Sequence, residues 1–383
     1  MPIRVLQFFS TLNNGGAENR MMDVYRCLDP DVVTFDFAVL HEGTHYFDAE
    51  VMEMGSEKYV LPDPRKGLIK NYRALVRFFK EHPFQAVHTH TSWYGGVVLM
   101  AAKQAGIKIR IAHARAAATP NRGWKETLVC NLGKILIAMS ATQRMAISRE
   151  AAENIFGKRA VEQGKYLYVP NAIDQKKYVV LDAAKRAELR ASLGIPAGKK
   201  AYVTVANLRK PKNHMFLLEV AKALKERDDP SVLYLIGEGD LRGDIEKRIC
   251  QLGLSDRVIL LGSRSDVPQI LCAFDGMIFP SIYEGLGGVV LEAQLVGVPA
   301  IVSDAVPNVV DVGIGMVEFI SLKTDPAQWA ETVVRKTSHV VWDRQRTLCA
   351  FRESGYCIEE TAKRYLREYG IPEQTICRVI KNP

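Results

Sequence analysis

The sequence lacks the features that would place the protein within a membrane or outside the cell. No apolar run among its 383 residues approaches the roughly 20 residues that span a bilayer. Residues 1–9 lead directly into a strand-like run, without the charged, apolar and cleavage regions of a signal peptide. The seven cysteines form no Cys-x-x-Cys pair and are expected to be reduced thiols. We therefore expect a cytoplasmic protein, or one bound peripherally to the inner face of a membrane.

Size and composition describe an ordinary globular chain whose charge is unevenly distributed. Its 383 residues fit two domains of common size, and its 48% hydrophobic and 25% charged residues are typical fractions. The net charge is +8: residues 1–173 hold 22 Lys+Arg against 16 Asp+Glu, and the remainder holds 29 against 27. This asymmetry favours an anionic partner for the first half, with a merely basic surface as the alternative. No helix-turn-helix, zinc or RNA-recognition signature is present, so we expect no nucleic acid; an anionic membrane surface or a phosphorylated lipid is the candidate.

Short apolar runs alternate with amphipathic helical stretches, which is typical of parallel sheets with helices on both faces. In the first half, strands are predicted over residues 4–9, 34–40, 86–89, 109–113, 143–147 and 166–169. In the second half, they are predicted over residues 201–206, 232–236, 258–261, 276–279 and 300–302. Between the two sets, Pro170 and Asn171 interrupt regular structure, and a polar helix follows over residues 183–192. The predicted fold class is α/β, with two Rossmann-like domains.

The most informative segment is a glycine-rich turn between two glutamates, Glu284-Gly-Leu-Gly-Gly-Val-Val-Leu-Glu292. It follows an apolar strand and precedes a helical run. A helix that begins near Gly287 would gather free backbone N–H groups into an anion site formed by Gly285, Leu286, Gly287 and Gly288. The Glu292 carboxylate would lean back toward that site and Glu284 would flank it, so that both could accept hydroxyl groups of a sugar nucleotide. Two solvated glutamates near a helix start are the alternative.

Residues 280–299, PSIYEGLGGVVLEAQLVGVP, resemble the Glu-x7-Glu signature of the retaining, GT-B-fold glycosyltransferases called family 4 or group 1. The resemblance extends along nearly the whole chain. It implies two Rossmann-like domains that face each other across a cleft: an acceptor-side domain over residues 1–170 and a nucleotide-sugar-binding domain over residues 175–355. A helix is predicted over residues 358–369, with Ala362, Tyr365 and Leu366 on one face. The resemblance implies that this C-terminal helix, within residues 358–383, packs back on the first domain.

Gly15 and Gly16 follow the first predicted strand and precede a helix. Open α/β sheets bind ligands at this edge, although a plain glycine turn is the alternative. The family resemblance places the two glycines against the donor phosphates and the acceptor. No Gly-x-Gly-x-x-Gly motif is present, which argues against a nicotinamide cofactor.

Three histidines lie at the ends of neighbouring predicted strands. His88 and His90 are two residues apart, hence on one face, and His113 ends the next strand. The sequence shows no further ligands at the spacing of a zinc site, and a structural role is the alternative for each histidine. The resemblance implies that His90 contacts the acceptor and the donor sugar, with His88, His113 and Arg115 on the acceptor side. His113-Ala-Arg115 departs from the family's His-Ser-His pattern.

A basic loop, Asn207-Leu-Arg-Lys-Pro-Lys-Asn-His214, follows the strand predicted over residues 201–206. Cations at the carboxyl edge of a strand can neutralise a diphosphate, and a solvated basic loop is the alternative. In the family, an arginine follows a glycine here and a lysine comes five residues later. Lys212 matches that lysine, Asn207 stands in place of the arginine, and Arg209 is the candidate that compensates. In the same way Gly237, Ser263 and Arg264 resemble the pocket that holds the nucleoside.

The residues and the resemblance together predict a retaining glycosyltransferase. It would move a sugar from a nucleotide-diphosphate sugar, for which a UDP-sugar is the expected donor, to a hydroxyl of a glycan or lipid-linked acceptor. The acceptor would belong to the synthesis of surface or capsular polysaccharide or of glycolipid. His90, Glu284 and Lys212 are the predicted catalytic residues, and Glu292 would hold the ribose. Backbone N–H groups and Lys212 would stabilise the departing diphosphate, which accepts the acceptor's proton. No cofactor and no metal ion are expected.

Two helices of the first half carry basic residues that could lie on anionic lipid. The first is predicted over residues 68–79. Its apolar side chains form one stripe that is expected to face the core, and its basic side chains lie on the other faces. The stripe consists of Leu68, Tyr72, Leu75, Val76 and Phe79. The second is predicted over residues 121–141. It combines Arg122, Lys125 and Lys134 with Trp124, Leu128, Leu132 and Leu136.

Other functions remain as alternatives. A metal-dependent GT-A enzyme needs Asp-x-Asp after a strand; Asp29-Pro-Asp31 matches the string but is predicted to end a helix. A sugar-nucleotide epimerase of the same architecture would release free epimerised donor. A two-domain sugar-binding protein would transfer no sugar to any acceptor.

Overall fold

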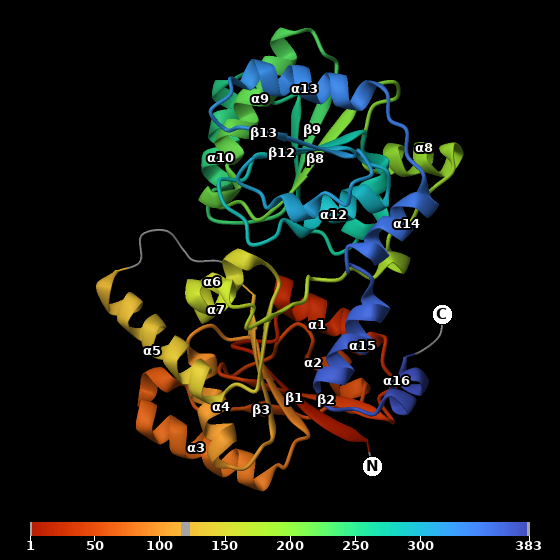
Figure 1. The fold of residues 1–383 in the computed structure, drawn as a ribbon. Helices are drawn as coiled ribbons and strands as arrows, with labels where there is room; N and C mark the ends of the chain where they lie inside the picture. The colour runs from red at the N-terminus through yellow and green to blue at the C-terminus, as the bar shows by residue number, and fades with distance from the viewer. Residues whose placement is uncertain (1, 116–122, 381–383) are drawn as a thin grey trace. The chain divides into compact units, whose positions relative to one another are not determined.

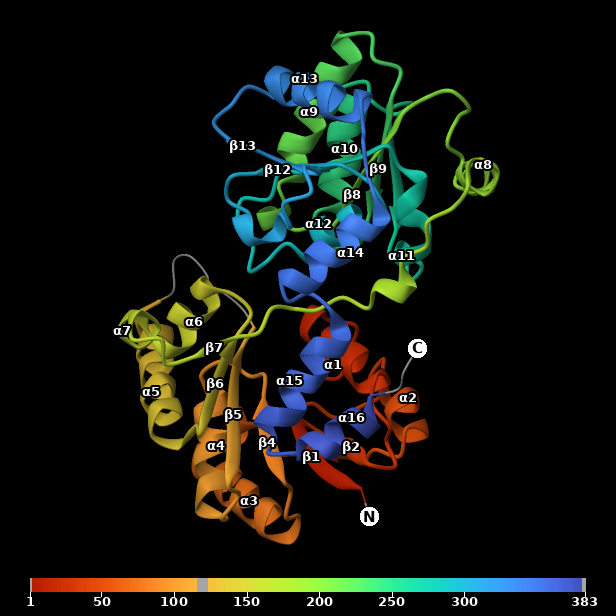
Figure 2. The same ribbon diagram turned by 45° about the vertical axis from the view of Figure 1, so that its right-hand side comes forward.

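The computed structural model describes residues 2–115 and 123–380. The chain divides into two compact units (Figures 1 and 2): residues 1–173 with 355–383 form unit 1, and residues 174–354 form unit 2. Both units have a parallel sheet with helices on its faces, as the alternating pattern predicts. Among the described residues, no helix is both long enough and apolar enough to cross a bilayer.

Unit 1 contains a seven-stranded parallel sheet in the order β3-β2-β1-β4-β5-β6-β7. Its strands are β1 (Ile3–Phe8), β2 (Val33–Val39), β3 (Lys58–Val60), β4 (Ala86–Thr89), β5 (Ile109–Ala114), β6 (Gln143–Ala146) and β7 (Leu167–Tyr168). Its helices are α1 (Gly16–Arg26), α2 (Asp48–Glu53), α3 (Leu68–Glu81), α4 (Tyr94–Gln104), α5 (Trp124–Ser140), α6 (Arg149–Phe156), α7 (Lys158–Glu162), α15 (Ile358–Glu368) and α16 (Glu373–Val379). The predicted strand over residues 166–169 is reduced to two residues, and the sequence pattern did not reveal β3.

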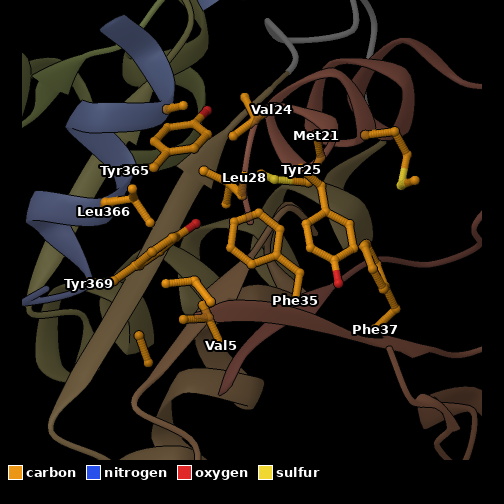
Figure 3. Packing of buried hydrophobic residues seen from close by; sticks show 14 of the residues in the cluster. Val5, Met21, Val24, Tyr25, Leu28, Phe35, Phe37, Tyr365, Leu366 and Tyr369 are labelled. Carbon is orange, nitrogen blue, oxygen red and sulfur yellow. The ribbon is translucent and has the colours of Figure 1, made fainter. Parts of the chain in front are cut away.

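The two faces of this sheet bury separate apolar clusters. Because side chains alternate along β1, Val5 belongs to the cluster under α1 and α15, whereas Leu6 and Phe8 belong to the cluster under α3 and α4. Figure 3 shows the first cluster, in which Tyr365 and Tyr369 from the end of the chain lie with Tyr25 and Phe35 from its beginning. The C-terminal segment is therefore part of the core of unit 1.

The helix predicted over residues 358–369 is α15, and the rest of the C-terminal segment adds a second helix, α16, after Gly370 and Pro372. Gly370 has φ +71°, a conformation that ends a helix and favours glycine, and proline at 372 cannot donate the hydrogen bond that would continue α15. Residues 381–383 lie outside the described part of the chain.

Two predicted helices of unit 1 need correction. In α3 the buried side chains are Asn71, Leu75, Phe78 and Phe79. Leu68 is 48% exposed because it is the first residue of the helix, which packs through its later turns. The helix predicted over residues 121–141 is α5, which begins at Trp124; Arg122 lies outside the described residues, as does the side chain of Lys125.

Unit 2 contains a six-stranded parallel sheet in the order β10-β9-β8-β11-β12-β13. Its strands are β8 (Ala201–Val205), β9 (Val232–Ile236), β10 (Val258–Gly262), β11 (Gly276–Phe279), β12 (Ala300–Ser303) and β13 (Val317–Ile320), the last not predicted. Its helices are α8 (Ala183–Ser192), α9 (His214–Glu226), α10 (Arg242–Gln251), α11 (Val267–Ile270), α12 (Gly288–Leu295), α13 (Pro326–Ser338) and α14 (Arg344–Glu353). A fully buried Trp329 anchors α13 on the core that α9 also covers.

In each unit the strand order reverses its direction once. The reversal lies between β1 and β4 in unit 1 and between β8 and β11 in unit 2. Crossover connections leave opposite faces of the sheet on the two sides of such a point, so the loops at its carboxyl edge separate and leave room for a ligand. The loops that follow these four strands are therefore the first places to look for a site.

Candidate functional site

In unit 2, the loops that follow β8 and β11 are joined to each other at the reversal point. The backbone N–H of Ile282 donates to the carbonyl of Pro211 over 2.8 Å. The Lys212 ammonium donates to the Glu284 carboxylate, and their side chains are only 25% and 10% exposed. The Lys212 nitrogen also lies 5.5 Å from the centre of the Phe279 ring, a cation–π distance. The predicted cation and the predicted acid are thus brought together as one ion pair.

The turn from β11 into α12 has the form that the sequence predicts. Gly287 is the N-cap of α12 with φ +83°, and α12 begins at Gly288. The positive φ favours glycine, and a Cβ atom on Gly287 would lie in a tight contact, 3.0 Å from Cγ1 of Val306. Gly285 and Gly288 are partly exposed, whereas Leu286 is 4% exposed and anchors the loop. The first N–H groups of α12 have no partner within the helix and carry its positive dipole end.

Glu292 and Arg209 lie in the predicted segments, and their positions do not by themselves assign a role. Glu292 is the fifth residue of α12 and is partly buried, one turn into the helix as predicted. Arg209 is exposed at the start of the 3-10 turn Lys210–Lys212, in the loop of Lys212. The structure therefore brings Lys212, Glu284 and the glycine turn together, and it leaves the roles of Glu292 and Arg209 as predictions.

The glycines after β9 allow that loop to pass close to the loop after β8. Gly237 has φ +144°, and a Cβ atom on Gly239 would lie 2.6 Å from the carbonyl oxygen of Leu208. Leu208 in turn donates its N–H to the Glu238 carbonyl over 3.0 Å. Beyond β10, Ser263 is exposed, and Arg264 forms an ion pair with Asp266 at 2.6 Å. The four loops thus lie along one edge of the sheet.

His214, the first residue of α9, was seen in the sequence only as the end of the basic loop. It is 2% exposed, and neither ring nitrogen has a hydrogen-bond partner among the described residues. Burial, and to a smaller extent the Lys212 charge, lowers the pKa of His214 to about 4. A neutral imidazole therefore lies next to the Lys212 loop at neutral pH.

In unit 1, Gly15 and Gly16 lie at the start of α1, after β1, as predicted. Gly15 is the N-cap in an extended conformation, and a Cβ atom there would collide with the Glu18 carboxylate, which folds back over the helix start. Burial raises the pKa of Glu18. A Cβ atom on Gly16 would meet no atom within 4 Å, so open space lies beside that residue.

The three predicted histidines form one cluster on the face of the sheet covered by α15. His88 lies on β4 beside Gln7 of β1, and His113 lies two residues beyond Ile111, the register partner of His88 on β5. The His88 and His90 rings are 4.3 Å apart, and the His88 and His113 rings are stacked at 5.2 Å. The three histidines that the sequence places at neighbouring strand ends therefore lie side by side, and their acceptor-side roles stay predictions.

A continuous chain of hydrogen bonds runs through this cluster. Arg115 Nε donates to His90 Nδ1 over 3.2 Å, and His90 Nε2 lies 3.0 Å from Gln7 Oε1. Gln7 Nε2 donates to the Tyr369 hydroxyl over 3.1 Å. The same hydroxyl lies 2.7 Å from His88 Nδ1. His88 Nε2 then lies 3.0 Å from His113 Nδ1. These bonds join three strands to the C-terminal helical segment.

The donor at the start fixes the bonds of His90, and the number of unsatisfied polar atoms decides the bonds of His88 and His113. A guanidinium can only donate, so His90 Nδ1 accepts and a neutral His90 carries its proton on Nε2, facing Gln7. The Tyr369 hydroxyl then accepts from Gln7 and donates to His88, whose proton on Nε2 faces His113. This assignment leaves one polar atom of the chain unsatisfied among the described residues, the buried Nε2–H of His113. If the bonds of His88 with Tyr369 and with His113 ran in the opposite direction, two polar atoms would be unsatisfied, the Tyr369 hydroxyl hydrogen and His113 Nε2.

The electrostatics of the cluster agree with neutral rings. Burial, together with the Arg115 charge, holds the pKa of His88, His90 and His113 well below the usual range. Among the described residues, these three histidines are the group whose nitrogens, all within 4.8 Å of one another, have the spacing of metal ligands. Five of their six ring nitrogens are engaged in the hydrogen bonds above, and a guanidinium contacts His90, so the arrangement fits a hydrogen-bonded network better than a cation site.

Sequence reasoning missed the residues that organise this cluster. Gln7 interrupts an apolar strand, and a polar residue in a central strand could have been read as a site signal. Tyr369 lies 281 residues after His88, and no local pattern relates them. Arg115 is further held by Asn171 Oδ1 at 2.7 Å. Asp29-Pro-Asp31, by contrast, lies between the end of α1 and β2, as its prediction as a helix stop requires.

Each of the two doubly wound units carries a glycine turn and charged or polar side chains at its reversal point, where open α/β sheets bind their ligands. Two family models give the class of enzyme. Residues 15–172 match a glycosyl transferase 4-like domain, and residues 185–333 match glycosyl transferases group 1. The chain belongs to this family of glycosyltransferases, and it is an enzyme of that kind.

Individual relatives agree with this assignment. The chain is 32% identical to EpsF of Bacillus subtilis, assigned as a glycosyltransferase. The match extends over 373 residues and covers 96% of each chain. It is 30% identical over 246 residues, 62% of this chain and 63% of the relative, to an Escherichia coli UDP-Gal:α-D-GlcNAc-diphosphoundecaprenol α-1,3-galactosyltransferase. In fold it is similar to the Anabaena protein HepE in complex with UDP, with TM-score 0.78, 18% identity and coverage of 97% of this chain and 100% of that one.

Proposed function

We propose that the protein transfers a sugar from a UDP-sugar to a hydroxyl of a lipid-linked acceptor in the synthesis of a cell-surface polysaccharide, with retention of anomeric configuration. The geometry that carries this proposal is the junction of the β8 and β11 loops, where Lys212, Glu284 and the α12 N-terminus lie at one sheet edge. Two relatives support the finer points. HepE has been crystallised with UDP and with UDP-glucose, and the E. coli relative is named for a UDP-galactose donor and a diphosphoundecaprenol-linked acceptor.

Each element of the junction has a chemical role in this proposal. The N–H groups at the start of α12 and the Lys212 ammonium stabilise the negative charge that develops on the departing diphosphate. Glu284, held by Lys212, accepts hydrogen bonds from sugar hydroxyls, and Glu292 accepts those of the ribose. These groups supply charge stabilisation without a divalent cation, so we propose a metal-independent reaction. The departing phosphate takes the proton of the acceptor hydroxyl.

The decisive variant is Glu292→Ala. It removes the proposed ribose contact, and we expect sugar transfer to fall by a factor of 100 or more while the fold persists. Glu331→Ala, which removes an exposed carboxylate on α13 of the same unit, is the matched control. Thermal stabilisation by a series of nucleotide sugars identifies the donor, because a ligand that binds the folded state raises the melting temperature.

Three results would contradict the proposal. Undiminished transfer by Glu292→Ala would remove the assigned site. Loss of activity in EDTA that magnesium restores would contradict the metal-independent reaction. Release of free epimerised donor, with no sugar on an acceptor, would favour the epimerase alternative.

A further inference from the structure

Helix α5 exposes one continuous apolar face. Five large side chains on it are between 53% and 74% exposed: Trp124, Leu128, Leu132, Ile135 and Met139. At 100° per residue they fall within about 80° of one another, and they extend along roughly 22 Å of the helix. An apolar stripe of this length on one helix is an interaction surface rather than the scattered exposure of an ordinary protein surface.

The opposite face of α5 is fully used in the core. Gly133, Ile137 and Ser140 are buried, and a Cβ atom on Gly133 would lie 2.6 Å from the Cβ atom of Trp93. Gly96 of α4 approaches equally closely, since a Cβ atom there would lie 2.8 Å from the Gly133 carbonyl oxygen. Close packing on α4 therefore fixes the orientation of α5, and the exposed stripe cannot rotate inward to bury itself.

The charge around α5 indicates what covers the stripe. Residues 82–149, which include α4, α5 and β4 to β6, contain a single acidic residue, Glu126. The same segment contains nine basic residues: Lys103, Lys108, Arg110, Arg115, Arg122, Lys125, Lys134, Arg144 and Arg149. Lys103 donates to the Met139 carbonyl over 2.8 Å, which places a cation at the C-terminal end of the stripe. Two copies of such a segment repel each other, whereas an anionic surface attracts it.

We propose that the exposed face of α5 inserts into the surface of a membrane that contains anionic lipid. Apolar side chains with a tryptophan suit the boundary between headgroups and acyl chains, and flanking cations suit the anionic headgroups. The inference rests on the proposed function to the extent that a lipid-linked acceptor is presented at such a surface. It names the part of the chain that brings unit 1 to that acceptor.

The test uses the full chain and vesicles without donor or acceptor. We expect it to sediment with vesicles of phosphatidylcholine and phosphatidylglycerol in a three-to-one ratio, and at least tenfold less with phosphatidylcholine alone. Leu128→Glu combined with Leu132→Glu should lower the partition coefficient tenfold or more, because both carboxylates would enter the lipid surface. Met52→Glu, a change of a 66% exposed side chain on α2 in the same unit, is the matched control and should bind as the parent does.

Trp124 provides a second, local readout. Its indole is 74% exposed and should enter the lipid boundary, so vesicle binding should shift the tryptophan emission to shorter wavelength. Trp124→Phe should remove most of that shift while most of the binding persists. A shift that survives in Trp124→Phe would overturn the assignment of α5 as the inserted element.

The outcomes separate this inference from the proposed function. Absence of vesicle binding, or equal binding by the Leu128/Leu132 variant, would overturn the membrane surface even if sugar transfer is observed. Vesicle binding without transfer to any acceptor would contradict the proposed function alone. A stable dimer that the same double variant dissociates would show that a second copy of the chain covers the stripe, and would also overturn the proposal.

Discussion

At the scale of single residues, the most consequential feature is the hydrogen-bond chain from Arg115 to His113. Arg115 can only donate, which fixes the tautomer of His90, and the tautomers assigned to His88 and His113 leave the fewest buried polar atoms unsatisfied. His90 is a predicted catalytic residue, and both its nitrogens are engaged, with Arg115 and with Gln7. His90 is therefore oriented by its neighbours, and neither of its ring nitrogens has a free lone pair.

The tautomers can be measured directly. We expect ¹⁵N spectra of histidine-labelled protein to show His88, His90 and His113 with the proton on Nε2. Tyr369→Phe removes the hydroxyl that donates to His88, so His88 and His113 should partly change to the Nδ1–H form, with a cost in stability of about 1–3 kcal/mol. His90, fixed by Arg115 and Gln7, should not change.

Tyr365→Phe is the control for that experiment. The Tyr365 hydroxyl accepts a hydrogen bond from Arg115 over 3.3 Å and is not part of the series of hydrogen bonds that joins the histidines. Its loss should leave all three tautomers as they are. An Nδ1–H signal from His88 or His113 in the parent protein would show that the direction assigned to the chain is wrong.

At the scale of elements, the turn before α12 shows why the glycine positions differ in importance. Gly287 has φ +83°, and a Cβ atom there would contact Val306, Phe279 and Val310, whereas a Cβ atom on Gly285 would have no neighbour within 4 Å. Both positions are glycine in the motif, and only the structure shows that their surroundings differ. The same holds for Gly15 and Gly16, of which only the first is enclosed by Glu18.

Gly287→Ala and Gly285→Ala are a matched pair of substitutions. Alanine at position 287 meets an unfavourable backbone conformation and a 3.0 Å contact, so we expect a loss of about 1–2 kcal/mol in the stability of unit 2. Alanine at position 285 should change stability by less than about 0.5 kcal/mol. Denaturant unfolding monitors both, and equal losses would contradict the role assigned to the turn.

The sequence predicted most strands but missed one edge strand of each sheet. Long apolar runs such as β1 and β9 are visible because strands buried on both faces consist of apolar residues. The edge strands β3 and β13 are partly exposed, with Lys58 and Glu318 among their residues, and their composition resembles that of loops. The helix predicted over residues 358–369 is α15, whereas α16, which follows Gly370 and Pro372, was not predicted.

The candidate site was predictable where local motifs carry it. Lys212, Glu284 and the glycine turn each follow a strand, and parallel strands bring such loops to one edge. The contacts that organise the histidines were not predictable, because Gln7, His88, Arg115 and Tyr369 come from distant parts of the chain. His214 was missed for another reason: its burial depends on how α9 packs, and a histidine after a basic loop reads as polar surface.

At the scale of the whole molecule, buried neutral histidines make stability depend on pH. The unfolded chain binds protons at histidine below about pH 6.5, whereas the folded state does not do so at His214 until about pH 4. The unfolded state therefore binds more protons in this window, and the free energy of unfolding falls as the pH decreases through it. His88, His90 and His113 act in the same direction in unit 1, since burial lowers the pKa of each.

We expect the stability of unit 2 to fall by on the order of 1–2 kcal/mol at His214 alone between pH 7 and pH 5. His214→Leu should remove that part of the slope, whatever it does to stability at pH 7. Denaturant unfolding at a series of pH values measures the slope. Equal slopes for the parent and His214→Leu would show that His214 takes up a proton in the folded state.

The return of α15 and α16 to the first sheet affects how the protein is made. Unit 2 is contained within unit 1 in the sequence, and Tyr365, Leu366 and Tyr369 complete a core that begins with Val5. During synthesis, residues 174–354 emerge from the ribosome before these side chains do, so unit 2 can fold while the sheet of unit 1 still lacks one of its covering helices. The nascent chain then exposes apolar surface around β1 and β2 until residues 358–379 have been made, so unit 1 completes its core only after the whole of unit 2 has been synthesised.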